Sequence, residues 1–111
     1  MKNYVQPGNT ISLTAPYAVT SGDGLLVGSI FGIASADAAS GETVEAALVG
    51  VFDLKKTASQ AWAAGDKLYW DNTAREATKT ATSNALIGVA VAAVAGGAGD
   101  TIGRVRLNGS F

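Results

Sequence analysis

The sequence predicts an all-β protein, a single small domain of the β-barrel or β-sandwich type that follows an extended N-terminal arm. Three observations support this fold class. Short apolar segments alternate with clusters of turn-forming residues, β-branched residues recur in those segments, and signals for the start or end of a helix are rare. A chain of 111 residues is long enough to bury about two-thirds of its unfolded surface in one core.

The N-terminal arm is expected over residues 1–9, and the β-rich domain over residues 10–111. The segment "MKNYVQPG" holds one Lys, polar residues and the chain breaker Pro7-Gly8 rather than a long apolar run, so we expect no signal peptide here. An extended segment of this kind is poorly ordered alone and can bind by pairing with a sheet edge. The side chains available for such binding are Lys2, Asn3, Tyr4, Val5, Gln6 and Pro7.

Six or seven strands are expected after the arm. Turn clusters such as "TSGDG" at 20–24 and "GGAGD" at 96–100 separate them. The best helix signal is "TASQAW" at 57–62, where Thr or Ser can cap one turn that closes near Gly65, so we expect at most one short helical turn. The expected strands cover residues 10–14, 25–34, 43–53, 67–71, 75–80, 85–94 and 101–107.

Three of these strands share a sequence pattern. "ALVGVF" at 47–52 matches "ALIGVA" at 85–90 at four of six positions, and "LLVGSI" at 25–30 shares the Leu-Val-Gly centre. Glycine inside a strand is costly unless it marks a bulge, a bend or a close backbone approach. Bends at equivalent places suit a small curved barrel. Chance similarity among short apolar strands explains the pattern equally well, so the repeat favours an all-β fold without establishing a barrel.

The most apolar run, residues 85–97, does not predict a membrane span. As a helix, its first eleven residues would rise roughly 16 Å, against about 30 Å of bilayer hydrocarbon. Its Val and Ile content and the internal Gly88 favour a strand over a buried helix. No membrane partner is therefore expected.

The segment "DKLYWD" at 66–71 predicts a strand with two different faces. Side chains alternate along a strand, so Leu68 and Trp70 are expected in the core, with Tyr69 on the opposite face. An aromatic residue there is either ordinary exposed surface or an interface anchor. Asp66 and Asp71 flank the strand at turns, and they are expected to form those turns rather than to act as a catalytic pair.

The composition argues against catalysis and against nucleic-acid binding. Eight basic and nine acidic residues give a net charge of −1, so no basic surface is expected to attract a phosphate backbone. The absence of Cys and His removes thiolate nucleophiles, imidazole bases and the usual zinc ligands. "GGAGDTIGR" lacks the Lys-Ser/Thr of a phosphate-binding loop. We therefore expect no enzyme activity, no catalytic residues, no metal and no cofactor.

The final strand predicts one further candidate surface. In "IGRVRLN", Arg104 and Arg106 alternate with Val105 and Leu107, so the two arginines share one face. They face either the carboxylates of a partner or solvent. Together with Tyr69 they are the candidate residues of a subunit interface.

The chain resembles the family of small capsid cement, or decoration, proteins of tailed bacteriophages. The resemblance covers nearly the whole chain. Its most distinctive parts are "GDKLYWD" at 65–71 and the closing "GRVRL". It is carried, in order, by "VQPGNTISLTAPYAV", "ALVGVFDLKK", "AAGDKLYWDNTAREAT" and "GRVRLNG".

This resemblance implies a structural virion protein made in the host cytoplasm. Such a protein binds the outer surface of the assembled capsid and bridges neighbouring subunits of the major capsid protein. Decoration proteins commonly occupy three-fold sites, so the resemblance also implies a homotrimer on the capsid, formed through the apolar strands and Tyr69. The arm residues Lys2 to Pro7 would then be the capsid-binding segment.

A second hypothesis remains open from the sequence. A small β-barrel can also serve as a module that binds a peptide or a glycan. That function would require a surface groove lined by Tyr4, Tyr17 and Tyr69.

Overall fold

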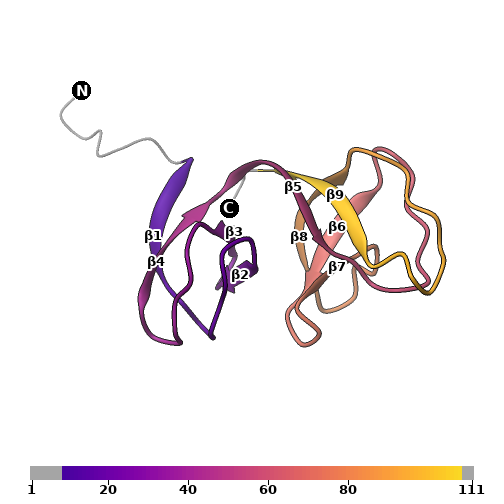
Figure 1. Cartoon of the computed structure of the whole chain (residues 1–111). Helices are drawn as coiled ribbons and strands as arrows, with labels where there is room; N and C mark the ends of the chain where they lie inside the picture. The colour runs from indigo at the N-terminus through magenta and orange to yellow at the C-terminus, as the bar shows by residue number, and fades with distance from the viewer. Residues whose placement is uncertain (1–8, 109–111) are drawn as a thin grey trace, which may run out of the picture.

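Nine strands and no helix make up the part of the chain that the structure describes. The structure is a computed structural model, and it describes residues 9–108 (Figure 1). The predicted all-β class is confirmed. In chain order the strands are β1 (Thr10–Thr14), β2 (Gly24–Val27), β3 (Ile30–Ala34), β4 (Thr43–Ala47), β5 (Val49–Lys55), β6 (Lys67–Asp71), β7 (Glu76–Thr78), β8 (Ala85–Ala90) and β9 (Ile102–Asn108).

The strands form two antiparallel sheets at different ends of the molecule (Figure 1). The N-terminal sheet has the order β1-β4-β3-β2, and the C-terminal sheet has the order β5-β9-β8-β6-β7. The chain crosses between them from β4 to β5, where Leu48 alone separates the two strands. Gly50 has a φ of 123°, a value that glycine adopts at little cost. This glycine therefore permits the bend that carries β5 into the second sheet.

The C-terminal sheet curls until its two edge strands approach each other. Lys56, just after β5, forms a parallel bridge with Ala77 of β7. The Thr57 N–H donates to the Ala77 carbonyl oxygen at 3.0 Å, and Lys55 lies 3.9 Å from the Glu76 carboxylate. The result is a half-barrel, which agrees with the small curved sheet expected from the sequence.

Two of the predicted strands are each divided into two. The segment 25–34 becomes β2 and β3, because Gly28, with a φ of 60°, lies in a tight turn between them. The segment 43–53 becomes β4 and β5, which belong to different sheets. The expected number of six or seven strands was therefore too low. Every expected segment contains or overlaps an observed strand, but the strands expected over 75–80 and 85–94 are shorter than predicted.

The helical turn allowed for at 57–62 does not form. Ser59 has a φ of 58°, which is outside the right-handed helical region. The Gln60 side chain donates to Thr78 Oγ1 at 3.2 Å and accepts from the Lys79 N–H at 2.8 Å. Hydrogen bonds to a distant strand thus replace the local bonds of a helical turn.

The core consists of two hydrophobic clusters, and the larger one combines residues from both sheets. Leu68 and Trp70 are buried as predicted, and Trp70 is only 3% exposed. Its ring lies 4.9 Å from the ring of Phe31, measured between centroids, and Phe31 comes from β3 of the other sheet. Ala77 pairs directly with Trp70 across the hairpin, so the small residue leaves room for the large one. This contact joins the two sheets.

Gly88 confirms the expectation that a mid-strand glycine marks a close approach. A Cβ at this position would lie 2.0 Å from the carbonyl oxygen of Arg106 on the neighbouring strand. The pairing of β6 with β8 shifts register between Leu68 and Tyr69, beside this glycine. The absence of a side chain at Gly88 therefore lets β8 and β9 pack closely.

Candidate interaction surfaces

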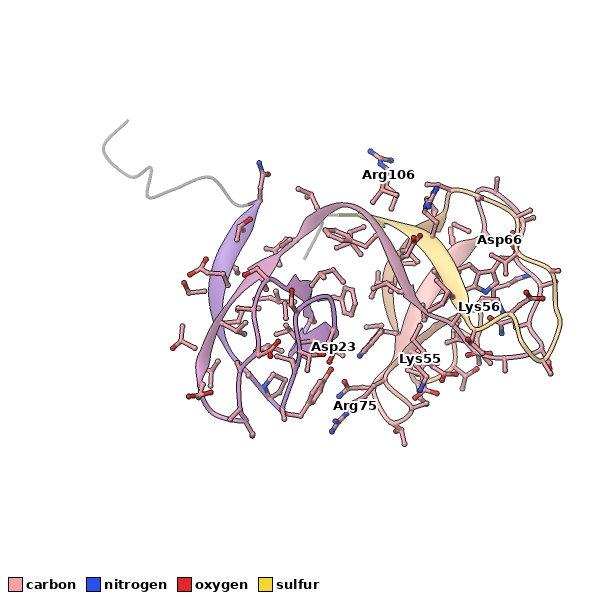
Figure 2. All side chains as sticks on the ribbon, viewed as in Figure 1. Asp23, Lys55, Lys56, Asp66, Arg75 and Arg106 are labelled. Carbon is pink, nitrogen blue, oxygen red and sulfur yellow. The ribbon has the colours of Figure 1, made fainter. Side chains whose placement is uncertain are left out.

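The outer face of the C-terminal sheet brings together the three residues predicted for a subunit interface. Tyr69 pairs with Leu86, and Arg106 pairs with both Val51 and Val89. Alternation along each strand places Tyr69, Arg104 and Arg106 on the side opposite to the buried Leu68, Val105 and Leu107. We call this side the C-terminal outer face; Figure 2 shows Arg106 projecting away from the sheet.

Apolar side chains that were not among the candidate interface residues lie on the same face. Val51 is 53% exposed and Ile102 is 57% exposed, and smaller exposed fractions are found at Val49 and Leu86. In β9, exposed and buried positions alternate, so the period-2 pattern that placed Arg104 and Arg106 also places Ile102 on this face. Apolar residues gathered around a few polar groups are typical of a protein-binding surface.

The charges on this face are only partly neutralised. Arg104 Nε donates to Asp53 Oδ1 at 2.9 Å, and this bond lowers the pKa of the Asp53 carboxyl group. Arg106 has no ion pair within residues 9–108. Within the described residues, the face therefore presents a guanidinium group without an ion pair, between the exposed Val51 and the partly buried Val89.

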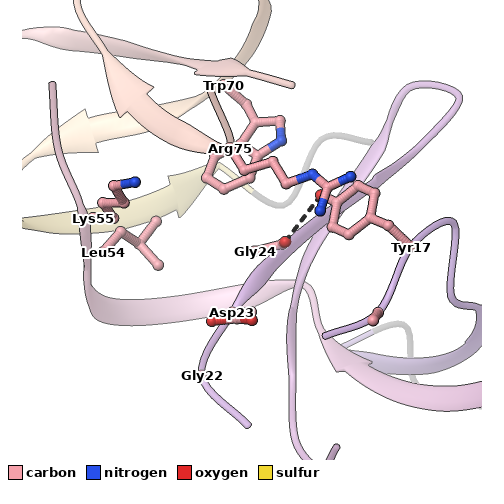
Figure 3. A pocket seen from close by; sticks show the side chains of 9 residues that line it. Tyr17, Gly22, Asp23, Gly24, Leu54, Lys55, Trp70 and Arg75 are labelled. Carbon is pink, nitrogen blue, oxygen red and sulfur yellow. Dashed lines mark hydrogen bonds between the residues drawn. The ribbon is translucent and has the colours of Figure 1, made fainter. Parts of the chain in front are cut away.

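A second surface, a groove of about 150 Å³, lies between the two sheets (Figure 3). Tyr17, from the connection between β1 and β2, stands on one side, and Arg75, from the turn between β6 and β7, stands on the other. The Arg75 guanidinium carbon lies 3.8 Å from the centroid of the Tyr17 ring, a cation–π contact. Trp70 and Leu54 contribute to the lining from the C-terminal sheet.

Hydrogen bonds make this groove a joint between the sheets. The Tyr17 hydroxyl lies 3.1 Å from the Gly24 carbonyl oxygen and 3.3 Å from Asn72 Oδ1, and Trp70 Nε1 donates to the same Asn72 oxygen at 3.0 Å. Burial is the main cause of the raised pKa of Tyr17. Asn72, in the turn after β6, thus bonds to Tyr17, which lies 55 residues away in the sequence.

The tyrosines proposed for a peptide or glycan groove do not line one groove. Tyr17 lies between the sheets, whereas Tyr69 lies on the C-terminal outer face, the opposite side of β6 from Trp70. Tyr4 and the rest of the arm set, Lys2 to Pro7, lie outside the described residues. The structure therefore gives that hypothesis no common site.

The turn carboxylates have the predicted structural contacts. Asp71 Oδ1 accepts from the backbone N–H groups of Thr73 and Ala74, at 3.0 and 3.1 Å. Asp66 Oδ2 accepts from the Ala63 N–H at 2.8 Å and lies 3.2 Å from the Lys79 ammonium group. The backbone bond is the main reason why the pKa of Asp66 is lowered. Both residues form turns, as predicted.

Lys56 is a buried cation that sequence reasoning did not single out. It is 1% exposed, and its ammonium group donates to the carbonyl oxygens of Thr57 and Asp100, at 2.6 and 3.0 Å. The same nitrogen lies 5.6 Å from the centroid of the Trp62 ring. These contacts hold the loop after β5 against the loop before β9, so the lysine has a structural position.

The described residues contain little that suggests other chemistry. Residues 9–108 hold no group of three or more His, Cys, Asp or Glu side chains arranged to bind a metal ion. In that same part of the chain, no helix is long and apolar enough to cross a membrane.

An exposed apolar and cationic face on a small β domain is typical of a protein-binding surface. The model of the phage cement protein family matches residues 5–107, and the chain belongs to this family. Membership gives the protein a structural role in the phage capsid. Neither the curated proteins nor the solved structures include a match to the chain.

Proposed function

We propose that the protein binds the outer surface of the assembled capsid and stabilises the shell by bridging neighbouring major capsid protein subunits. The observation that carries this proposal is the match to the cement protein family over residues 5–107. The exposed apolar residues of the C-terminal outer face support it, since they indicate a protein partner.

The stabilisation follows from linked equilibria. A protein that binds the assembled shell more tightly than the separate subunits shifts the equilibrium towards the shell by its differential binding free energy. At a free concentration of one hundred times the dissociation constant, one site contributes about 2.7 kcal/mol. Many copies on one shell multiply this contribution, so each contact can be modest.

Two surfaces have different roles in this proposal, one in binding the capsid and one in joining copies of the protein. The arm residues Lys2 to Pro7 contact the major capsid protein by pairing with a sheet edge. They precede Asn9, whose carbonyl oxygen accepts from the Leu48 N–H at 2.8 Å, next to the crossing between the sheets. The C-terminal outer face, with Tyr69, Arg104 and Arg106, joins copies into a trimer on the capsid.

Deletion of residues 1–8 tests this division. Purified heads that lack the protein are mixed with the full chain or with the deletion variant, and binding is measured by cosedimentation. We expect the full chain to bind and to raise the temperature at which heads release their DNA. We expect the variant to keep its melting temperature but to lose binding, because the described strands begin at Thr10.

The possible outcomes separate the parts of the proposal. Full binding by the variant would show that the arm is not the capsid contact. Failure of the full chain to bind heads would refute the capsid function itself.

A further inference from the structure

The two sheets carry opposite net charge. Residues 9–48, which include the N-terminal sheet, contain four acidic residues and no Lys or Arg. Residues 49–108, which include the C-terminal sheet, contain seven basic and five acidic residues. The overall charge of −1 hides this separation. The sheets lie at different ends of the molecule (Figure 1), so the protein has an acidic end and a basic end.

The outer faces of the two sheets are complementary in chemistry. At the exposed positions of β1 and β4, the outer face of the N-terminal sheet presents small Ser and Thr side chains and the carboxylate of Glu45. Ser12 pairs with Glu45 across the strands, and its hydroxyl donates to the carboxylate. The C-terminal outer face presents Arg106 between Val51 and Val89. The N-terminal outer face thus presents a carboxylate surrounded by short side chains. The C-terminal outer face presents a guanidinium group surrounded by larger apolar side chains.

We propose that the C-terminal outer face of one copy packs on the N-terminal outer face of the next, with Arg106 opposite Glu45. This proposal rests on the proposed function, because it specifies how copies join in the trimer. Sheets pack face to face at about 10 Å, a spacing that small residues on one side and larger ones on the other can fill. Burial of Val51 and Ile102 would supply the apolar contribution.

The charge distribution selects this head-to-tail arrangement over a symmetric pair. A two-fold dimer through the C-terminal outer face would place the cations of each copy against each other. Like charges brought together in an interface disfavour that pairing. A head-to-tail contact instead places opposite charges together. When the rotation between successive copies closes after three, it gives a ring in which every copy uses both faces.

A charge-swap experiment tests the contact. The variants are Arg106→Glu, Glu45→Lys and the double variant with both changes, all in the full chain. Sedimentation velocity measures self-association, and thermal melting confirms that each variant folds. We expect each single change to raise the dissociation constant about tenfold or more, because it creates a like-charge pair. We expect the double variant to recover to within about threefold of the original chain.

A matched control separates local contact from net charge. Lys79→Glu changes the charge by the same amount as Arg106→Glu, but Lys79 follows β7 in a loop and pairs with Asp66. It should change the dissociation constant by less than about twofold. Association of the original chain should also weaken as salt is raised.

Other outcomes overturn the proposal. If Arg106→Glu abolishes association while Glu45→Lys has no effect, the C-terminal outer face contacts a different surface, such as the major capsid protein. A double variant no better than the single variants, or an original chain that stays monomeric, also contradicts it. Head binding of the original chain, measured separately, shows whether the capsid function stands when this contact fails.

Discussion

The buried clusters of the two sheets are built from residues of different size. The buried cluster of the N-terminal sheet consists of Leu, Val and Ala, and four of its nine members are alanines. The cluster of the C-terminal sheet contains both tryptophans and receives Phe31 from the other sheet. Large aromatic side chains bury more apolar surface per residue. The C-terminal sheet therefore holds the larger core, and the N-terminal sheet is attached to it through the contacts of Phe31 and Tyr17 near Trp70.

The largest expected effect comes from removing the joint itself. Trp70→Ala should lower the free energy of unfolding by about 3–5 kcal/mol, because it empties a site in contact with Phe31. Thermal or urea unfolding, followed by probes in each sheet, measures it. Both sheets should lose stability together, since Gly24 of β2 also lies against the Trp70 ring.

Tyr69→Ala on the outer face of the same strand is the matched control, and its cost should be much smaller. If Trp70→Ala leaves the N-terminal sheet at its original stability, the two sheets unfold independently and the comparison fails.

A second, smaller effect concerns the close contact of β8 with β9. Gly88→Ala should destabilise the protein by about 1–3 kcal/mol, because the added Cβ would meet the Arg106 backbone oxygen and force the strands apart. Gly99→Ala is the control, since a Cβ at that position would meet nothing within 4 Å. Equal melting temperatures for the two variants would contradict the close approach.

The sequence was sufficient for features that depend on neighbouring residues. Alternation in "DKLYWD" placed Leu68 and Trp70 inside, and turn chemistry accounted for Asp66 and Asp71. The cost of glycine in a strand pointed to Gly88. Each of these predictions uses only the geometry of one strand or one turn.

The sequence was insufficient where distant segments decide the structure. The bonds of Gln60 to Thr78 and Lys79 cancel a local helical signal, and Gly28 follows the pattern of Gly88 yet forms a turn. Strand alternation places Lys56 on the same side as the buried Leu54. Because lysine is normally exposed, this pattern did not indicate a buried residue. The uneven distribution of acidic and basic residues can be read from the sequence, but the net charge of −1 does not reveal it.

A third effect, smaller again, tests the polar part of the joint. Tyr17→Phe removes the hydroxyl that lies 3.1 Å from the Gly24 carbonyl oxygen and should cost about 1 kcal/mol. The ring and its contact with Arg75 remain, so the change isolates the hydrogen bond. Urea unfolding measures the difference. A cost as large as that of Trp70→Ala would mean that hydrogen bonding, not aromatic packing, holds the sheets together.

The smallest effect concerns the surface ion pair between Arg104 and Asp53 in the C-terminal sheet. It is measured most directly as a change in the pKa of Asp53. The Arg104 hydrogen bond lowers the pKa of Asp53 in the folded protein, so the carboxyl binds fewer protons there than in the unfolded chain. The resulting stabilisation is present above the ordinary Asp pKa of about 3.9 and is lost as the pH falls through the folded value. An NMR titration should show Arg104→Gln returning the Asp53 pKa towards about 3.9. Arg106 is on the same face but is not bonded to Asp53, so Arg106→Gln should leave the pKa of Asp53 lowered. Equal pKa shifts in both variants would mean that the general positive charge of this sheet, rather than one bond, sets the pKa.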